Sequence, residues 1–454
     1  MTRPRSSSVT ATLLRYLATA CKHRAMYPPE HPVVRRALDD LVQLLDLLLR
    51  DRDVITFQIY EDTFFLDNQM LPEESLRYAA LLTACLERGV GVCAIRRGIS
   101  AQEAHAFVNL LTTPTAVVRA RGGPAAVLAE SGVQHVTVES PREAPPTEMP
   151  VEVEPASAYQ AGTLVAQELR AQAVRRQPLD MRRARVFLSA AIEVVLENRS
   201  ALLALMADRS HDESSAYHAV NVALLALVIG TRLELSREAL MALGMGALLH
   251  DIGKVRVGPD LLNRATPLEP DEQSALDRHP AHGANILRDL DGLGRLAMVC
   301  ALEHHLHADG SGYPEPAGGV RPHLFSRIVA VADTYDTVTS ARRGTQRPLR
   351  PDLAMKWIAV GLGSIYDPVV GKVFLKMMGV YPVGSLVQLN TGEVAVVVRP
   401  AESRVNCPVV QVVRDGRPAE VVDLAVAADR WIVTGVDPAD AGVDAAAVLQ
   451  SSAA

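Results

Sequence analysis

The chain has few cysteines for its 454 residues, and their placement excludes two classes of protein. It contains five, an odd number, and no two form a C-x-x-C pair. A disulfide-stapled secreted domain or a zinc-ribbon framework needs regularly spaced, paired thiols. The five are therefore interpreted as reduced and mostly buried side chains of an intracellular protein. They are Cys21, Cys85, Cys93, Cys300 and Cys407.

Excess positive charge and long apolar runs are also missing. The formal net charge is −6, which argues against broad binding of nucleic acids or anionic membranes as the main role. The longest apolar run, "NVALLALVIG", is about half the length that a bilayer span requires. The basic, Ser-rich start has neither a continuous apolar stretch nor the cleavage pattern of a signal peptide. We expect no membrane span, no DNA or RNA partner and a cytoplasmic location.

A hydrophobic content of 48% and this length are sufficient for two or three domains with buried cores. The clearest boundary is "SPREAPPTEMPVEVEPAS", whose Pro- and Glu-rich composition is typical of a linker. The predicted fold class is multidomain, with an α/β domain, an all-α bundle and a small β-module. The predicted ranges are the α/β domain at 1–139, the linker at 140–157, the bundle at 158–380, the β-module at 381–437 and a disordered tail at 438–454.

Local patterns support this division. In the first domain, two helices are expected on either side of Tyr27-Pro28-Pro29, a hairpin in "VITFQIYEDTFFLDN", and a helix over "PEESLRYAALLTACLERG". Ser100-x-x-Glu103 is a capping box that should begin another helix. In the β-module, turns at Asn390-Thr391-Gly392 and Asp415-Gly416 each predict a pair of strands. The α/β domain offers no catalytic cluster, so a sensory, dimerisation or partner-binding role is its predicted function.

The bundle carries an unusual set of histidines and aspartates, each in or at the end of a predicted helix. They are His218, His250, Asp251, His279, His304, His305 and Asp333. A single histidine on a helix is more often structural than a ligand, but an unpaired buried aspartate such as Asp251 would cost several kcal/mol. Helices of a bundle can direct such residues into one interior site. The joint pattern therefore predicts a metal centre.

The number of candidate ligands is too large for one tetrahedral zinc and suits two metals about 3.5–4 Å apart. Imidazoles with a few carboxylates favour Fe, Mn, Zn or Ni over Ca or Mg. Adjacent residues on a helix point about 100° apart, so His304 and His305 can serve two centres or two faces of one. The turn that follows them, "DGSGYP", has glycines that let the backbone approach a bound ligand.

Four segments together resemble a known family. "LLHDIGK", "RHPAHGANIL", "HHLHADGSGYP" and "RIVAVADTYDTVTS" are similar in order and spacing to the HD-GYP subgroup of HD-superfamily metal-dependent phosphohydrolases, which includes bacterial phosphodiesterases that act on cyclic di-GMP. The resemblance covers roughly residues 200–375, and the β-module also looks like an extension of some members. It implies that the seven residues above are metal ligands, with Asp251 as the bridge and Fe or Mn the first expectation, Zn or Ni the second.

The resemblance also implies substrate contacts and a mechanism. Lys254 falls where the family contacts a substrate phosphate, and Arg342 falls at an arginine near the ligand. The signature turn, linked to substrate access and to contacts with partner domains, consists of Gly310, Gly312, Tyr313 and Pro314. A hydroxide between the two metals would attack phosphorus in line with the leaving 3′-oxygen, with Asp251 and Lys254 as the catalytic residues. The product would be the linear dinucleotide, with GMP from a second cleavage.

Departures from the family pattern leave alternatives open. Members with three metals carry a glutamate four residues before the first histidine; here Ser214 stands there, which predicts two metals. The common "HHE" is His304-His305-Leu306, which removes a polar group that could orient a ligand, and the loop after Ser340 is altered. One alternative is a weak or inactive domain that serves as a cyclic di-GMP receptor or interaction platform. Another is hydrolysis of a different phosphoester. A partner protein at the first domain or the signature turn, and a homodimer, are further hypotheses.

Overall fold

The structure is a computed structural model that describes most of the chain. The described residues are 6–60, 62–67, 69–141, 153–207, 215–262, 264, 266–290, 294–315, 321–340, 348–400, 404–414 and 416–452. Two compact units, Met1–Ala161 and Gly162–Ala454, are described separately below. Their boundary lies inside helix α8 (Pro155–Val174), slightly beyond the predicted linker, of which residues 142–152 lie outside the described part. Among the described helices, none combines the length and the apolar character that crossing a membrane demands.

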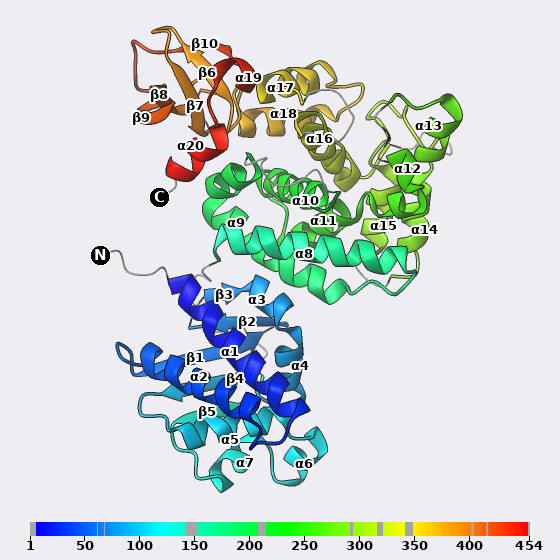
Figure 1. Ribbon diagram of the computed structural model, residues 1–454. Coiled ribbons are helices and arrows are strands. Elements are labelled where there is room, and N and C mark those ends of the chain that lie inside the picture. The colour runs from blue at the N-terminus through cyan, green and yellow to red at the C-terminus, as the bar shows by residue number, and fades with distance from the viewer. Residues whose placement is uncertain are drawn as a thin grey trace. The chain divides into compact units, whose positions relative to one another are not determined.

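The first unit is built on a five-stranded antiparallel sheet with the strand order β3-β2-β1-β4-β5 (Figure 1). Its strands are β1 (Val54–Tyr60), β2 (Thr63–Leu66), β3 (Gln69–Leu71), β4 (Val92–Arg96) and β5 (Val136–Glu139). Its helices are α1 (Ser6–Met26), α2 (Pro32–Leu48), α3 (Pro72–Arg77), α4 (Ala79–Glu87), α5 (Ala101–Thr112), α6 (Thr115–Ala120) and α7 (Pro124–Glu130). The predicted hairpin is confirmed as β1 and β2. The single helix predicted next is wrong in one respect, because it is interrupted at Tyr78, which ends α3 and precedes α4.

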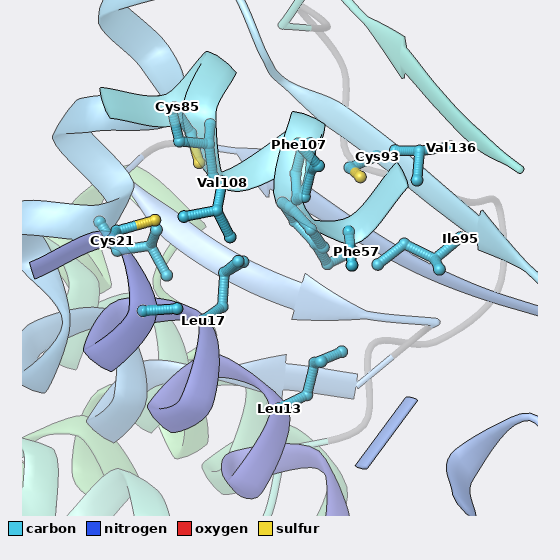
Figure 2. Close-up of a cluster of buried hydrophobic side chains, with 14 of the residues drawn as sticks. Leu13, Leu17, Cys21, Phe57, Cys85, Cys93, Ile95, Phe107, Val108 and Val136 are labelled. Carbon is cyan, nitrogen blue, oxygen red and sulfur yellow. The ribbon is translucent and has the colours of Figure 1, made fainter. Parts of the chain in front are cut away.

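The core of the first unit lies between the helices and the sheet. Leu13 and Leu17 of α1 belong to one buried cluster with Phe57 of β1 and Phe107 of α5 (Figure 2). Three of the cysteines, Cys21, Cys85 and Cys93, are buried in the same core, and burial raises the pKa of Cys21 to about 12. They are therefore protonated thiols that act as small apolar side chains.

Glu103 joins helix α5 to strand β5. The capping box is confirmed: Ser100 accepts from the amide of Glu103, and the Glu103 carboxylate accepts from the amide of Ser100. That carboxylate also accepts from the amides of Gln134 (2.7 Å) and His135 (2.9 Å). Burial raises the pKa of Glu103, but these hydrogen bonds outweigh it and hold the pKa well below its usual range.

The second unit begins with a bundle of helices and ends in a β-module (Figure 1). After α8 its helices are α9 (Met181–Ala207), α10 (Ser215–Arg232), α11 (Arg237–Leu249), the 3₁₀ turn η1 (Ile252–Arg256), α12 (Pro259–Leu262), α13 (Pro270–Leu276), α14 (His279–Leu287), α15 (Gly294–Glu303), α16 (Leu324–Thr339), α17 (Pro351–Val360) and α18 (Pro368–Met378). Helix α10 is buried without interruption from Ala219 to Gly230 because its sequence is apolar on every side. It is therefore the central helix, against which α9, α11 and α16 pack.

Two glycines allow the close packing that builds the site. A Cβ on Gly246 of α11 would lie 2.5 Å from the sulfur of Cys300 on α15. A Cβ on Gly253 of η1 would lie 2.0 Å from the carbonyl oxygen of His279 and 2.4 Å from the amide nitrogen of Gly283, both on α14. Only hydrogen fits in these spaces, so α15 and α14 approach α11 and η1 more closely than any other residue would permit.

The β-module is a five-stranded antiparallel sheet in the order β10-β6-β7-β8-β9. Its strands are β6 (Leu386–Leu389), β7 (Val394–Arg399), β8 (Val409–Arg414), β9 (Arg417–Asp423) and β10 (Ile432–Gly435). The four predicted strands are confirmed, whereas β10 was not predicted. The prediction of a disordered tail is wrong for residues 438–452, which form α19 (Pro438–Ala441) and α20 (Ala445–Ser452). Helix α20 is held because its side chains Val448 and Leu449 are buried.

Candidate metal centre

The structure brings the seven predicted ligand residues together from six elements. His218 lies on α10, His250 is the residue at the end of α11, and Asp251 precedes η1. His279 begins α14, His304 and His305 follow α15, and Asp333 lies on α16. His250, His279 and His304 are almost completely buried. Residues up to 115 positions apart in the sequence therefore share one interior site.

Within this site the side chains form two groups that have Asp251 in common. One consists of His218, His250 and Asp251, and the other of Asp251, His279, His304 and His305; in each group the candidate ligand atoms lie within 4.8 Å of one another. Oδ2 of Asp251 is 3.4 Å from Nε2 of His250, and Oδ1 is 3.2 Å from Nε2 of His279. The two oxygens of one carboxylate thus face the two groups. Asp333 joins the first group, with Oδ1 3.1 Å from Nε2 of His218.

The hydrogen bonds of the imidazoles show that this cluster suits cations. Nδ1 of His250, His279 and His304 lies 2.7, 2.8 and 3.0 Å from the carbonyl oxygens of Ala247, Leu276 and Ala301. A carbonyl can only accept, so each Nδ1 carries the proton and each Nε2 of the neutral ring presents a lone pair. Yet the Nε2 atoms of His279 and His304 face each other at 3.2 Å. Two lone pairs at that distance repel unless a cation lies between or beside them.

Unsatisfied buried atoms in the cluster support the same conclusion. Within the cluster, Nε2 of His250 and Oδ1 of Asp251 are buried and make no hydrogen bond to any described residue, and Nε2 of His218 faces the carboxylate of Asp333. Buried polar atoms are rarely left unsatisfied, and here they belong to the groups that transition metals prefer. The residues present therefore fit divalent transition-metal ions, with imidazole nitrogens and carboxylate oxygens as ligands.

The electrostatics of the cluster are dominated by its carboxylates. Burial raises the pKa of Asp251, but Lys254 and His250 outweigh it and hold the pKa well below its usual range. Burial likewise opposes ionisation of Asp333, but the hydrogen bond to His218 holds its pKa well below the usual range. Burial lowers the pKa of His218, but hydrogen bonds to Asp333 and Asp336 raise it to about 9. The negative potential around His218 thus attracts a cation, whether a proton or a metal.

The second group carries less negative charge, because it contains three imidazoles and only one carboxylate. Burial lowers the pKa of His304, and burial together with His304 lowers the pKa of His305 to about 2. These rings are therefore neutral, as metal ligands must be. His305 is covered by Tyr313, whose ring stacks on it with centroids 4.5 Å apart and an interplanar angle of 29°.

The predicted signature turn lies directly against His304 and His305. The amide of Tyr313 donates to the carbonyl of His305. Gly312 has φ +95°, and a Cβ there would lie 2.3 Å from the same carbonyl oxygen, so glycine is required for this approach. The other side of the turn is fixed by two amides, those of Ala308 and Asp309, which donate to Ile365 and Ser364 between α17 and α18.

Lys254, the predicted phosphate contact, lies beside the shared carboxylate. Its Nζ is 2.5 Å from Oδ2 of Asp251, and its side chain is 22% exposed. A 3₁₀ turn has three residues per turn, so Lys254, three residues after Asp251, lies on the same side of η1 as that carboxylate. Its charge therefore lies at the edge of the cluster. Arg342, the other predicted substrate contact, lies outside the described residues, as does Ser214.

Comparisons with known proteins concern the same part of the chain that holds this cluster. Residues 192–370 match the family model described as HD domain. The chain is 34% identical over 252 residues to the cyclic di-GMP phosphodiesterase PA4108 of Pseudomonas aeruginosa, a match that covers 54% of this chain and 60% of that protein. Residues 192–370 therefore form an HD domain, in agreement with the HD-GYP resemblance.

Two other relatives of this HD domain act on cyclic dinucleotides according to their names. The response regulator RpfG of Xanthomonas campestris, a cyclic di-GMP phosphodiesterase, is 34% identical over 31% of this chain and 37% of its own length. The 3′3′-cGAMP-specific phosphodiesterase 3 of Vibrio cholerae is 31% identical over 37% of this chain and 36% of its own length. The chain thus spans between about a third and three fifths of the length of these relatives.

Sequence reasoning missed two residues that support the candidate metal centre. Asp336 accepts from Nδ1 of His218 at 2.7 Å, and its other oxygen accepts from the side-chain amide of Asn221 at 2.9 Å. The signal was present: Asp336 follows Asp333 by three residues, and Asn221 follows His218 by three, so each pair shares a helix face. Leu306, which replaces the family's glutamate, is buried and bridges to Gly312 below the signature turn.

Proposed function

We propose that the chain hydrolyses cyclic di-GMP to the linear dinucleotide at a centre that holds two divalent transition-metal ions. The observation that carries the proposal is the division of the six other candidate side chains into two groups around the two oxygens of Asp251. One cation could not contact all of these atoms, whereas a shared carboxylate is the usual bridge between two. The names of the three relatives support a cyclic dinucleotide as the substrate class.

Metals bound here would supply Lewis acidity toward a phosphoryl oxygen and lower the pKa of water. His218, His250 and Asp333 would hold one ion, His279, His304 and His305 the other, and Asp251 both. Fe or Mn is the first choice for this mixture of nitrogen and oxygen ligands, and Zn or Ni the second.

The protein's own side chains would orient the substrate and offset its charge. Lys254 Nζ lies at the edge of the cluster and would stabilise negative charge on a non-bridging phosphate oxygen. Phosphoryl transfer depends mainly on such positioning and charge stabilisation. Tyr313 covers His305 with its ring and excludes water from that side of the ligand. Gly310 and Pro314 complete the turn around it.

The test is turnover by the purified chain after loading with Mn²⁺ or Fe²⁺ under reducing conditions. Cyclic di-GMP and 3′3′-cGAMP are incubated separately, and the products are separated by chromatography. We expect the linear dinucleotide from cyclic di-GMP and a loss of more than about 100-fold in rate for Asp251→Ala, because a ligand common to both metals is removed. Asp260→Ala, an exposed carboxylate on α12, is the matched control and should retain the rate.

Two results would contradict the proposal. Metal-loaded protein that binds cyclic di-GMP without hydrolysing it would identify a receptor instead. Hydrolysis of 3′3′-cGAMP alone would retain the reaction class but change the substrate.

A further inference from the structure

The second nitrogen of His218 has a partner of a different kind from those of His250, His279 and His304. Each of these three donates from Nδ1 to a backbone carbonyl, which is neutral. His218 donates from Nδ1 to the carboxylate of Asp336 instead. A carboxylate behind an imidazole fixes its tautomer and its orientation and makes the opposite nitrogen a stronger metal ligand.

Asp336 is itself held in place by the helix that carries His218. It is 4% exposed, and its Oδ1 accepts from the amide of Asn221, which is also buried. His218 and Asn221 lie one helical turn apart on α10, and each donates a hydrogen bond to a different oxygen of Asp336. Ser340 adds a weaker contact to Oδ1 at 3.4 Å. A buried carboxylate with both oxygens engaged has little freedom to rotate away from the imidazole.

From this geometry we propose that Asp336 is a positioning residue that strengthens the metal position formed by His218, His250 and Asp251, and that Asn221 fixes Asp336 for that task. The inference rests on the proposed two-metal centre. The two metal positions are then unequal, because among the described residues only the first contains an imidazole whose other nitrogen donates to a carboxylate. Loss of the Asp336 charge should weaken that position and leave the one formed by His279, His304 and His305 intact.

The experiment measures Mn²⁺ binding to the metal-free chain by electron paramagnetic resonance of the free ion. Asp336→Asn retains the shape of the side chain but removes its charge. We expect one equivalent of Mn²⁺ to bind about 10- to 100-fold more weakly and the other to be unchanged. Asp352→Asn is the matched control, because Asp352 is equally buried at 4% exposure but pairs with Arg350, and both affinities should stay at the wild-type values.

A double mutant distinguishes a positioning role from a general effect on folding. If Asp336 acts through His218, Asp336→Asn should add no further loss in a His218→Ala background. Asn221→Ala, which leaves the carboxylate in place, should weaken the same equivalent by a smaller factor. It also provides the test if Asp336→Asn does not fold.

Several outcomes would overturn the inference. They are wild-type Mn²⁺ affinity in Asp336→Asn, an equal loss at both equivalents, and full additivity with His218→Ala. If Asp336→Asn cannot be purified folded, wild-type affinity in Asn221→Ala overturns it. None of these results depends on turnover, so a chain that binds Mn²⁺ as expected but does not cleave cyclic di-GMP would refute the proposed function and leave this inference standing.

Discussion

Gly253→Ala is expected to separate the two halves of the metal centre. The added Cβ would lie 2.0 Å from the carbonyl oxygen of His279 and 2.4 Å from the amide nitrogen of Gly283. Comfortable contacts lie near 3.5 Å, so η1 and α14 must move apart by roughly 1.5 Å. Both opposing atoms are backbone, and no side chain can rotate to absorb the shift. Metal sites tolerate errors of about 0.2 Å in ligand distance, so His279 should no longer share a metal with Asp251.

The expected magnitude follows from the cost of overpacking. Such insertions destabilise by about 1–3 kcal/mol, which corresponds to a fall in Tm of about 2–12 °C for a unit of this size. Both tryptophans, Trp357 and Trp431, lie in the second unit, so thermal unfolding followed by tryptophan fluorescence reports on it. Metal retained after dialysis is measured on the same samples by atomic emission.

The matched control is Gly258→Ala. Gly258 lies five residues further along, and a Cβ there would meet nothing within 4 Å. Its Tm and metal content should match those of the wild type. If Gly253→Ala behaves like Gly258→Ala in both measurements, the account of how η1 and α14 form the site is wrong.

Two further predictions concern the first unit and the signature turn. Glu103→Gln should destabilise the first unit by about 1–3 kcal/mol at pH 7, measured by hydrogen exchange of the β5 amides. Because the folded pKa of Glu103 is depressed, its contribution to stability is present above the unfolded pKa of about 4.3 and is lost as pH falls below that value. The variant should therefore lose stability less steeply in acid than the wild type. Equal slopes of the free energy of unfolding against pH would contradict this. Gly312→Ala should impair metal retention, because it combines strain at φ +95° with a clash against His305, whereas Gly310→Ala, with a similar φ but open space, should show strain alone.

The sequence was sufficient to predict which residues gather in this cluster, because each is marked locally. His250 and Asp251 are adjacent polar residues at the end of an apolar helix, and His304 and His305 precede a glycine-rich turn. Their common site followed from a general property of bundles and from the family resemblance. The pairing of His218 with Asp336 could not be predicted with the same ease, because it joins residues 118 positions apart and the three-residue spacings to Asn221 and Asp333 are weak signals.

The errors in the fold have similar physical causes. Strand β10 is short and largely exposed, so its sequence has no strong alternation, and it exists because β6 offers a free edge. The tail is rich in alanine and small polar residues, which by composition suggests disorder. Its order comes from the burial of Val448 and Leu449, a tertiary effect that no local pattern contains.

The use of one carboxylate by both ligand groups makes the cluster unequally tolerant of mutation. Replacement of a single imidazole removes one donor from one group, and the neighbouring group keeps its full set. Replacement of Asp251 removes a donor from both at once. Under random mutagenesis with selection for partial metal occupancy, histidine variants should therefore survive at some frequency, while position 251 should admit almost no change.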